Sequence, residues 1–320
     1  MKKFPHPMFA LLLAYLFTLP GALAQTYPTK PIRMVVGFVA GGPTDAIARV
    51  FAQRLGNVLG QQVVIENRGG ADGVIAADVV AKAVPDGYTL FFASAGHAIN
   101  ASFYPKLPYR TVEDFAPVTL IGESPNIIAV TPSLPVKDLR EFVALAKSKP
   151  GALNYGATSS PTLLATELFD SLAGIKITRI PFKGAAPAMA AVMSGDVQLV
   201  ISGIGTTLPQ VRGGKLKGLA VTGARRSPLA PDMPTVVESG INFVATTWYG
   251  VLAPAGTPPA IIQRLNSVSR TLLEDSDVKA QAAPQGVVFT PSTPEEFGAF
   301  LRAEVALWAK VVKDTGIKAE

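Results

Sequence analysis

The 320-residue sequence contains no cysteine, and this absence removes several classes of function at once. Disulfide bridges, thiolate metal sites, iron–sulfur clusters and a cysteine nucleophile are all excluded. Histidine is almost as scarce, with His6 and His97 as its two copies, so a metal site built from several histidines is excluded as well. Charged residues make up 16% of the chain and apolar residues 48%, which predicts a folded protein with a large core.

The common catalytic and nucleotide-binding motifs are also missing. No His-Glu-x-x-His occurs, and Ser202 has Val200 and Ile204 where a hydrolase nucleophile elbow needs glycine. The segment Gly203–Leu208 begins like a dinucleotide fingerprint but ends in leucine where the third glycine belongs, so we interpret it as an ordinary turn. The basic residues lack the interleaved aromatic side chains of a nucleic-acid surface. We therefore expect no enzyme, no cofactor, no metal and no nucleic-acid partner.

The N-terminus has the three parts of a secretory signal peptide. Lys2 and Lys3 provide a positive start, Phe9–Leu19 is an apolar stretch, and a small-x-small cleavage site ends at Ala24. The apolar stretch is about half of the ~20 residues that a membrane span requires. We therefore expect a signal peptide over residues 1–24, cleavage after Ala24, and a periplasmic location for the mature chain.

Apolar runs rich in β-branched residues alternate with amphipathic helical stretches along the whole mature chain. This alternation is typical of an α/β protein in which helices cover a parallel sheet. One series of elements ends before Pro150 and a second, similar series follows it. The expected strands are 32–38, 63–65, 89–93, 127–131, 154–157, 177–181, 197–201, 219–222 and 249–253.

Apolar stripes with helical spacing predict the helices and their buried faces. The final helix is the most sharply defined, because Thr293 and Glu296 form a capping box with Pro294 at the first helical position. The residues expected on buried helix faces include Ile47, Phe51, Leu55, Val58, Ile75, Val79, Leu139, Phe142, Ala146, Leu164, Leu168, Leu172, Ile261, Leu265, Val268, Leu272, Phe297, Leu301, Val305, Trp308 and Val312.

Three strand-to-helix turns, at residues 38–45, 93–97 and 156–162, are built of small residues. Each would present backbone N–H groups or hydroxyls where a helix begins, and such groups bind anions without a buried lysine or arginine. For any single turn, tight chain reversal and helix capping explain the residues better. Three such turns together predict a cleft between two α/β lobes that holds a carboxylate.

Long motifs in the mature chain are similar to those of the extracytoplasmic solute receptors of tripartite tricarboxylate transporters, also called Bug receptors. The resemblance covers essentially the whole mature chain. The segments that carry it are Tyr27–Arg33, Val35–Asp45 with its Ala-Gly-Gly-Pro-Thr-Asp core, Val64–Ala71, Pro85–Leu90, Pro181–Gly184 and Trp248–Pro258.

The resemblance implies a type II periplasmic binding protein with two α/β domains and a carboxylate in the cleft between them. Domain 1 would combine residues 25–125 with 249–320, and domain 2 would span 126–248. The family holds its carboxylate largely through backbone amides, hydroxyls and water. The positions that match its ligand-binding residues are Phe38, Ala40, Gly41, Gly42, Thr44, Asp45, Ser94, Ala95, His97, Ser159, Ser160, Thr162, Lys183, Gly184, Ala185 and Gly203.

The sequence departs from the family pattern in two of its turns. Gly37 stands where the family often has proline, and Val39-Ala40 replace a commoner pattern that contains proline. Asp72 interrupts the usual Gly-Ala-Gly-Gly and would disfavour an anion if it faced the cleft. The turn that carries it, which follows the expected strand 63–65 and is called the second turn below, is therefore left out of the predicted site.

The resemblance predicts a monomeric receptor that closes around a small carboxylate and delivers it to the membrane permease of such a transporter. A signalling role, in which the liganded form docks on a sensor protein, is the alternative. An isomerase that uses Asp45 and His97 as an acid–base pair is a weaker alternative. The sequence does not identify the solute.

Overall fold

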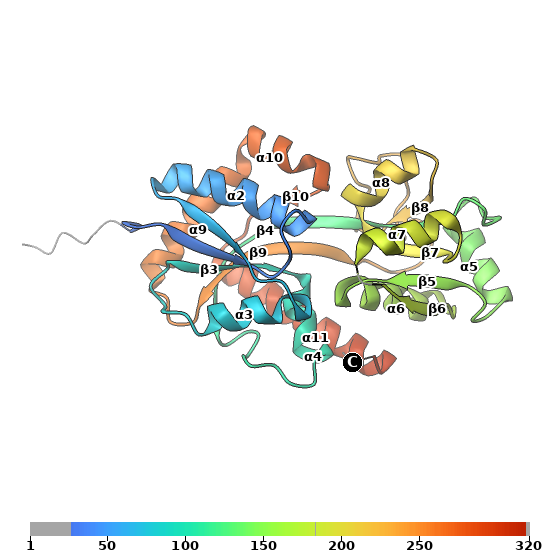
Figure 1. Cartoon of the computed structure of the whole chain (residues 1–320), viewed down its shortest axis with the longest axis horizontal. Coiled ribbons are helices and arrows are strands. Elements are labelled where there is room, and N and C mark those ends of the chain that lie inside the picture. The colour runs from blue at the N-terminus through green and yellow to red at the C-terminus, as the bar shows by residue number, and fades with distance from the viewer. Residues whose placement is uncertain (1–26, 183, 318–320) are drawn as a thin grey trace, which may run out of the picture.

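The computed structural model describes residues 27–182 and 184–317, so the predicted signal peptide lies outside the described residues. Within the described part of the chain, ten strands form a mixed sheet that runs through both halves of the molecule (Figure 1). The strand order is β2-β1-β3-β9-β4-β7-β5-β6, and β10 and β8 pair with β4 off this path. The strands are β1 (Ile32–Val36), β2 (Val63–Asn67), β3 (Thr89–Ser94), β4 (Phe115–Val130), β5 (Asn154–Ala157), β6 (Thr178–Pro181), β7 (Leu199–Gly203), β8 (Lys217–Val221), β9 (Thr246–Pro254) and β10 (Val288–Phe289).

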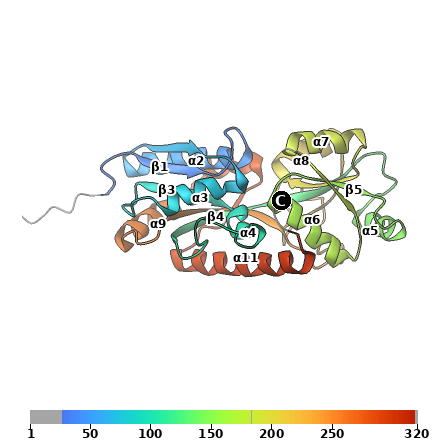
Figure 2. The same ribbon diagram turned by 60° about the horizontal axis from the view of Figure 1, so that its bottom comes forward.

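Helices cover both faces of the sheet in each half of the molecule (Figures 1 and 2). In the first half, Met34 of β1 packs toward α2, α9 and α10, while the next residue, Val35, packs toward α3, α4 and α11. In the second half, α5 and α6 lie on one face and α7 and α8 on the other. The helices are α2 (Pro43–Leu59), α3 (Val74–Ala81), α4 (Ala95–Phe103), α5 (Leu139–Ser148), α6 (Ser160–Ala173), α7 (Ala185–Ser194), α8 (Ile204–Arg212), α9 (Pro259–Glu274), α10 (Ser276–Ala282) and α11 (Pro294–Thr315), with short 3-10 turns η1 (Ala71–Gly73) and η2 (Ala283–Gln285).

The two halves repeat one strand arrangement. Strands β1, β2 and β3 are parallel, as are β5, β6 and β7, and an antiparallel strand adjoins each set. The inner parallel strands β1, β3 and β7 are almost entirely buried and therefore need near-continuous apolar runs, whereas the edge strands β2 and β6 are partly exposed. The α/β class and the type II periplasmic binding protein fold are therefore confirmed.

Strand β4 is much longer than the sequence predicted. It starts at Phe115, twelve residues before the expected strand, and pairs with β9 as far as Pro125 before it pairs with β7 from Asn126 onward. The run Val118–Ile121 is mostly apolar and rich in β-branched residues, but Pro117 and Glu123 interrupt the pattern on either side, so it is not predicted as a strand. Strands β4 and β9 pass between the halves (Figure 1). The predicted domain boundaries at 125/126 and 248/249 stay a prediction.

Most of the predicted helix faces are buried, but several stripes end at the wrong residue. Val58, Ile75 and Leu172 were expected inside and are 57%, 48% and 49% exposed. Each step of four residues turns a helix by about 400°, so a stripe repeated at four-residue spacing drifts away from the core. In α6 the buried stripe therefore passes to Phe169 and Ala173 instead of Leu172.

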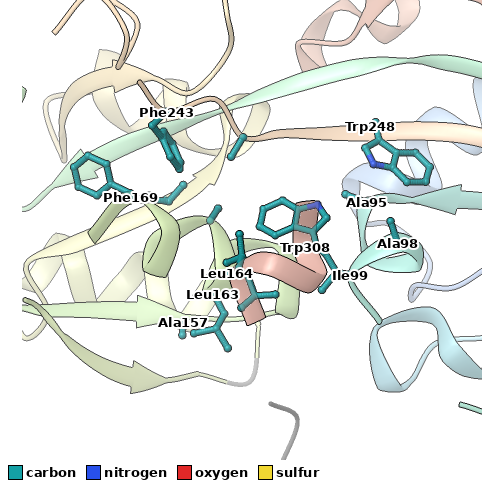
Figure 3. Close-up of a cluster of buried hydrophobic side chains, with 14 of the residues drawn as sticks. Ala95, Ala98, Ile99, Ala157, Leu163, Leu164, Phe169, Phe243, Trp248 and Trp308 are labelled. Atoms are coloured by element: carbon teal, nitrogen blue, oxygen red, sulfur yellow. The ribbon is translucent and has the colours of Figure 1, made fainter. Parts of the chain in front are cut away.

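Buried side chains from both halves form one continuous cluster (Figure 3). Ile99 of α4, Leu163 of α6 and Trp308 of α11 belong to it, so these three helices pack together where the halves meet. Glu304 accepts hydrogen bonds from the indole nitrogens of Trp248 at 2.9 Å and Trp308 at 3.0 Å. Burial raises the pKa of Glu304, an effect partly offset by the two indole donors. The junction is thus a packed interface.

No helix in the described ranges is both long and apolar enough to cross a membrane.

Candidate ligand-binding cleft

Helix N-termini from both halves gather where the halves meet. Helices α2 and α4 begin after the carboxyl ends of β1 and β3, and α6, α7 and α8 begin after β5, β6 and β7. In open α/β sheets, ligands bind at this edge of the strands. The first and third predicted turns therefore lie at the ends of parallel strands, as expected.

The first turn is held in place by Asp45, which is 2% exposed. Its carboxylate accepts hydrogen bonds from the Gly41 backbone N–H (2.9 Å), Arg49 Nε (2.8 Å) and Asn67 Nδ2 (2.9 Å). Burial raises the pKa of Asp45, but these hydrogen bonds outweigh burial and lower it below its ordinary value. The buried Asp45 carboxylate therefore holds the conformation of the turn through these hydrogen bonds. Phe38, Ala40, Gly41 and Gly42 form the turn itself.

Thr44 follows the turn in the first helical residues of α2. It is buried at 9% exposure. Burial raises the pKa of the Tyr249 hydroxyl, and Thr44 lies close enough to that hydroxyl to lower it in part. Tyr249 lies on β9, the strand that passes between the halves, so Thr44 joins the start of α2 to the crossing strand. This contact places Thr44 beside the junction.

The second turn, which the sequence analysis omitted, packs directly against the first. A Cβ atom on Gly37 would lie 2.7 Å from the Cα of Gly73, so the two backbones touch. Ala71 and Asp72 both adopt positive φ, at 46° and 50°. The Asp72 carbonyl accepts a hydrogen bond from Asn100 Nδ2 at 3.0 Å, which ties this turn to α4.

The turn predicted at 93–97 is not a loop, because helix α4 begins at Ala95 directly after β3. Ser94 and Ala95 are buried, at 6% and 1% exposure. His97 is 3% exposed and packs among Phe91, Tyr109 and Phe115.

The ring of His97 is packed in the core of the first half. Its Nε2 donates to the Thr111 carbonyl at 3.0 Å. Burial lowers the pKa of His97 to about 4, an effect opposed by the bond to Thr111. The imidazole is neutral at pH 7 and faces aromatic rings, so we do not retain His97 as a ligand contact or as an acid–base partner of Asp45.

The turn before α6 carries the most hydroxyl groups. Ser159 is the N-cap, and Thr162 Oγ1 accepts from the Ser159 N–H at 3.3 Å. Ser160 is 2% exposed, and its Oγ has no hydrogen-bond partner among the described residues. Its backbone N–H donates to Asp72 Oδ2 at 2.9 Å, a contact between the two halves.

A cavity of about 200 Å³ lies at this contact. It is lined from the first half by Asp72 and the end of α4, and from the second half by the start of α6 and the end of β6. Burial and the charge of Asp72 both raise the pKa of Tyr104, one of its wall residues. The lining residues are Asp72, Phe103, Tyr104, Ala157, Thr158, Ser159, Ser160, Leu163, Arg179, Pro181 and Phe182.

The remaining predicted residues line a second, smaller cavity, stand at the start of α7, or lie outside the described residues. Gly203 lines a cavity of about 30 Å³ together with Pro43 and Tyr249. Gly184 and Ala185 stand at the start of α7. Lys183 lies outside the described residues. The segment interpreted as an ordinary turn at Gly203–Leu208 is mostly helix, because α8 begins at Ile204.

Sequence reasoning missed three kinds of wall residue: Asp72, the aromatic residues Phe103, Tyr104 and Phe182, and Arg179. Asp72 had a signal, since it breaks the family pattern, and Phe182 lies within the Pro181–Gly184 motif, but Phe103, Tyr104 and Arg179 carry none. Among the described residues, no group of three histidine, aspartate or glutamate side chains is arranged to hold a metal ion.

Comparison with known proteins decides the family. The model of the tripartite tricarboxylate transporter family receptor matches residues 47–317. The chain belongs to this receptor family. Protein BugT of Bordetella pertussis is 39% identical over 300 residues, which cover 92% of each chain.

Two solved structures of the family carry a ligand. Rpa4515 of R. palustris with adipate is 37% identical, covers 91% of this chain and 99% of its own, and superposes with a TM-score of 0.83. MatC of Rhodopseudomonas palustris with bound malate is 33% identical, covers 89% of this chain and 100% of its own, and has a TM-score of 0.78. This tripartite tricarboxylate receptor thus shares its fold with proteins solved with dicarboxylates.

Proposed function

We propose that this receptor binds a small carboxylate in the cleft between its two halves and delivers it to the permease of a tripartite tricarboxylate-type transporter. In this proposal the mature chain starts after Ala24, acts in the periplasm as a monomer and catalyses no reaction. Residues 25–125 with 249–320, and 126–248, are the two domains that close on the ligand. The observation that carries the proposal is the cavity between the halves at the start of α6, in a chain related to receptors solved with adipate and malate.

The physics of the cleft fits a carboxylate. The start of α6 lines the 200 Å³ cavity, and the starts of α2 and α8 line the 30 Å³ cavity. Each helix start provides backbone N–H groups and a partial positive charge, a contribution of about 0.3–2 kcal/mol per helix terminus. Ser159 and Ser160 add hydroxyl groups that donate to an anion, and Arg179 lines the same wall. The proposed binding residues are those at the starts of α2, α6, α7 and α8, together with Tyr104 and Arg179, while Asp72 lines the same cavity as a carboxylate of the chain itself.

Closure would move the halves about the two strands β4 and β9, which pass between them. Strands at such a crossing permit a hinge motion because each half keeps its own sheet pairing. A ligand that contacts both halves binds only the closed form, and its affinity therefore includes the free energy of closure.

Thermal unfolding and calorimetry of the purified mature chain test the proposal. A panel of mono- and dicarboxylates, with neutral amides of the same acids as controls, should contain at least one acid that raises the melting temperature, since a ligand of the folded state stabilises it. Native mass spectrometry of freshly purified protein would reveal a co-purified acid. If no acid in the panel shifts the melting temperature or gives measurable heat, the proposal is wrong.

The delivery step has its own test. Immobilised receptor with saturating ligand should retain the permease subunits from detergent-solubilised membranes of the source cell, and ligand-free receptor should retain less. Equal retention in both states would contradict ligand-dependent delivery.

A further inference from the structure

The side chain of Asp72 spans the junction and ends on the first turn of a helix in the other half. Ser160, the first residue of α6, donates its backbone N–H to Asp72 Oδ2 at 2.9 Å. The first N–H groups of a helix have no partner within the helix, and the positive end of the helix dipole lies there. A carboxylate of this chain therefore already occupies an anion position of the cleft.

The turn that carries Asp72 is held rigidly in this place. The backbone carbonyl oxygen of Asp72 accepts a hydrogen bond from Asn100 Nδ2. The same oxygen lies 3.1 Å from the position that a Cβ atom on Gly96 would occupy. Gly73 touches Gly37 on the opposite side of the turn. A side chain longer than hydrogen at Gly37 or Gly96 would displace the turn, so packing on two sides aims Asp72 at α6.

The position that Asp72 occupies is itself suited to an external anion. Ser160 is 2% exposed, and its Oγ has no hydrogen-bond partner among the described residues, so a buried donor stays available beside the helix start. An unpaired buried hydroxyl is costly and gains from an acceptor. Both Ser160 and Asp72 line the 200 Å³ cavity.

We propose that Asp72 is a specificity-determining residue: it supplies the negative charge at the start of α6, so that the cleft accepts a ligand with a single carboxylate and rejects a second carboxylate at that end. This inference rests on the proposed function. The N–H of Ser160 is already engaged, and an incoming carboxylate would stand beside a like charge. Such a pair a few ångströms apart in a partly buried site is strongly repulsive. Rpa4515, solved with adipate, shows that a relative holds a ligand with two carboxyl groups.

The test compares acids that differ only in the second carboxylate. Dissociation constants are measured by calorimetry for hexanoate against adipate and for butyrate against succinate, in the mature wild-type chain and in Asp72→Asn. The amide oxygen of asparagine still accepts from Ser160, so the substitution removes the charge and keeps the hydrogen bond. Asp314→Asn, which breaks the exposed ion pair with Lys310 on α11, is the control for loss of one negative charge.

We expect the wild type to bind the monocarboxylate of at least one pair about tenfold or more tightly than its dicarboxylate partner. Asp72→Asn should reduce that ratio by about tenfold or more, mainly because the dicarboxylate binds more tightly, and Asp314→Asn should leave the ratio unchanged. Asp72→Gly suits the positive φ of this position and serves as the second variant, with the same direction of change expected.

The possible failures are distinguishable. If Asp72 only stabilises the closed form, its substitution weakens the binding of both acids of a pair by one common factor, and the ratio of their dissociation constants stays constant. That outcome overturns the specificity role. Wild-type protein that binds succinate or adipate as tightly as the matched monocarboxylate also overturns it, while the proposed function stands. If neither the wild type nor the variants bind any acid of a wider carboxylate panel, the proposed function fails and this inference falls with it.

Discussion

Replacement of Gly37 by alanine tests whether close contact between the first two turns shapes the cleft. The added Cβ would lie 2.7 Å from the Cα of Gly73, and an ordinary contact begins near 3.4 Å, so the two backbones must separate by about 0.7 Å. The φ of Gly37 is not in the left-handed region, so alanine tolerates the backbone and the clash is the whole effect. Overpacking of this kind costs about 1–3 kcal/mol of unfolding free energy.

Urea unfolding of Gly37→Ala and wild type, together with ligand calorimetry, measures both consequences. The midpoint should fall at constant slope, and the preference for a monocarboxylate over its matched dicarboxylate should weaken, because the displaced second turn carries the charge of Asp72 away from Ser160. Gly42→Ala is the control for stability, since its Cβ would meet only the Val39 carbonyl at an ordinary 3.6 Å. Its unfolding free energy should stay within about 0.5 kcal/mol of wild type. A Gly37→Ala protein that is as stable as Gly42→Ala and keeps the wild-type ratio of the two dissociation constants would refute the reasoning.

Three further predictions concern the scaffold. Glu304→Ala leaves two buried indole N–H groups without their acceptor and should cost about 2–5 kcal/mol of unfolding free energy. Glu304→Gln keeps an acceptor and should cost less than half as much. Equal losses of unfolding free energy in urea titrations of the two variants would contradict this. Burial raises the pKa of Asp170 to about 8, partly offset by the Ile177 N–H, so the folded protein holds a proton that the unfolded chain releases near pH 4. Unfolding free energy should therefore fall from pH 6.5 to pH 8 by at most about 1.4 kcal/mol per pH unit, and the same slope in Asp170→Asn would disprove the assignment. Thr293→Ala removes the N-cap acceptor for Glu296 and should cost about 1 kcal/mol, measured by urea unfolding with the exposed Thr271→Ala as control.

Local patterns predicted the parts of the fold that local physics determines. The capping box at Thr293 and Glu296 was expected and is present, with N–H to oxygen distances of 2.8 and 3.2 Å. Its partners are three residues apart, so no distant part of the chain is needed to form it. Strand β5 also coincides with its predicted bounds, and three of its four residues are buried.

The site was predicted less well, because residue type does not reveal which way a side chain points. Asp45 and His97 lie in the first turns of helices that begin at the expected edge of the sheet, yet Asp45 holds the first turn and His97 packs among aromatic rings. Small residues at strand ends predict a turn near a cleft. Whether a polar side chain there meets a ligand or its own backbone depends on packing.

The sequence by itself determined the α/β class, through periodicity, and the receptor family, through its resemblance to known motifs, since both signals come from residues close together in the chain. That a ligand binds at the carboxyl edge of the parallel strands stays a prediction. Only the tertiary structure decided that β4 extends back to Phe115 and that Asp72 meets the start of α6. The contact between Asp72 and Ser160 joins residues 88 positions apart. It exists because the two halves pack together through α4, α6 and α11, an arrangement that no local pattern encodes.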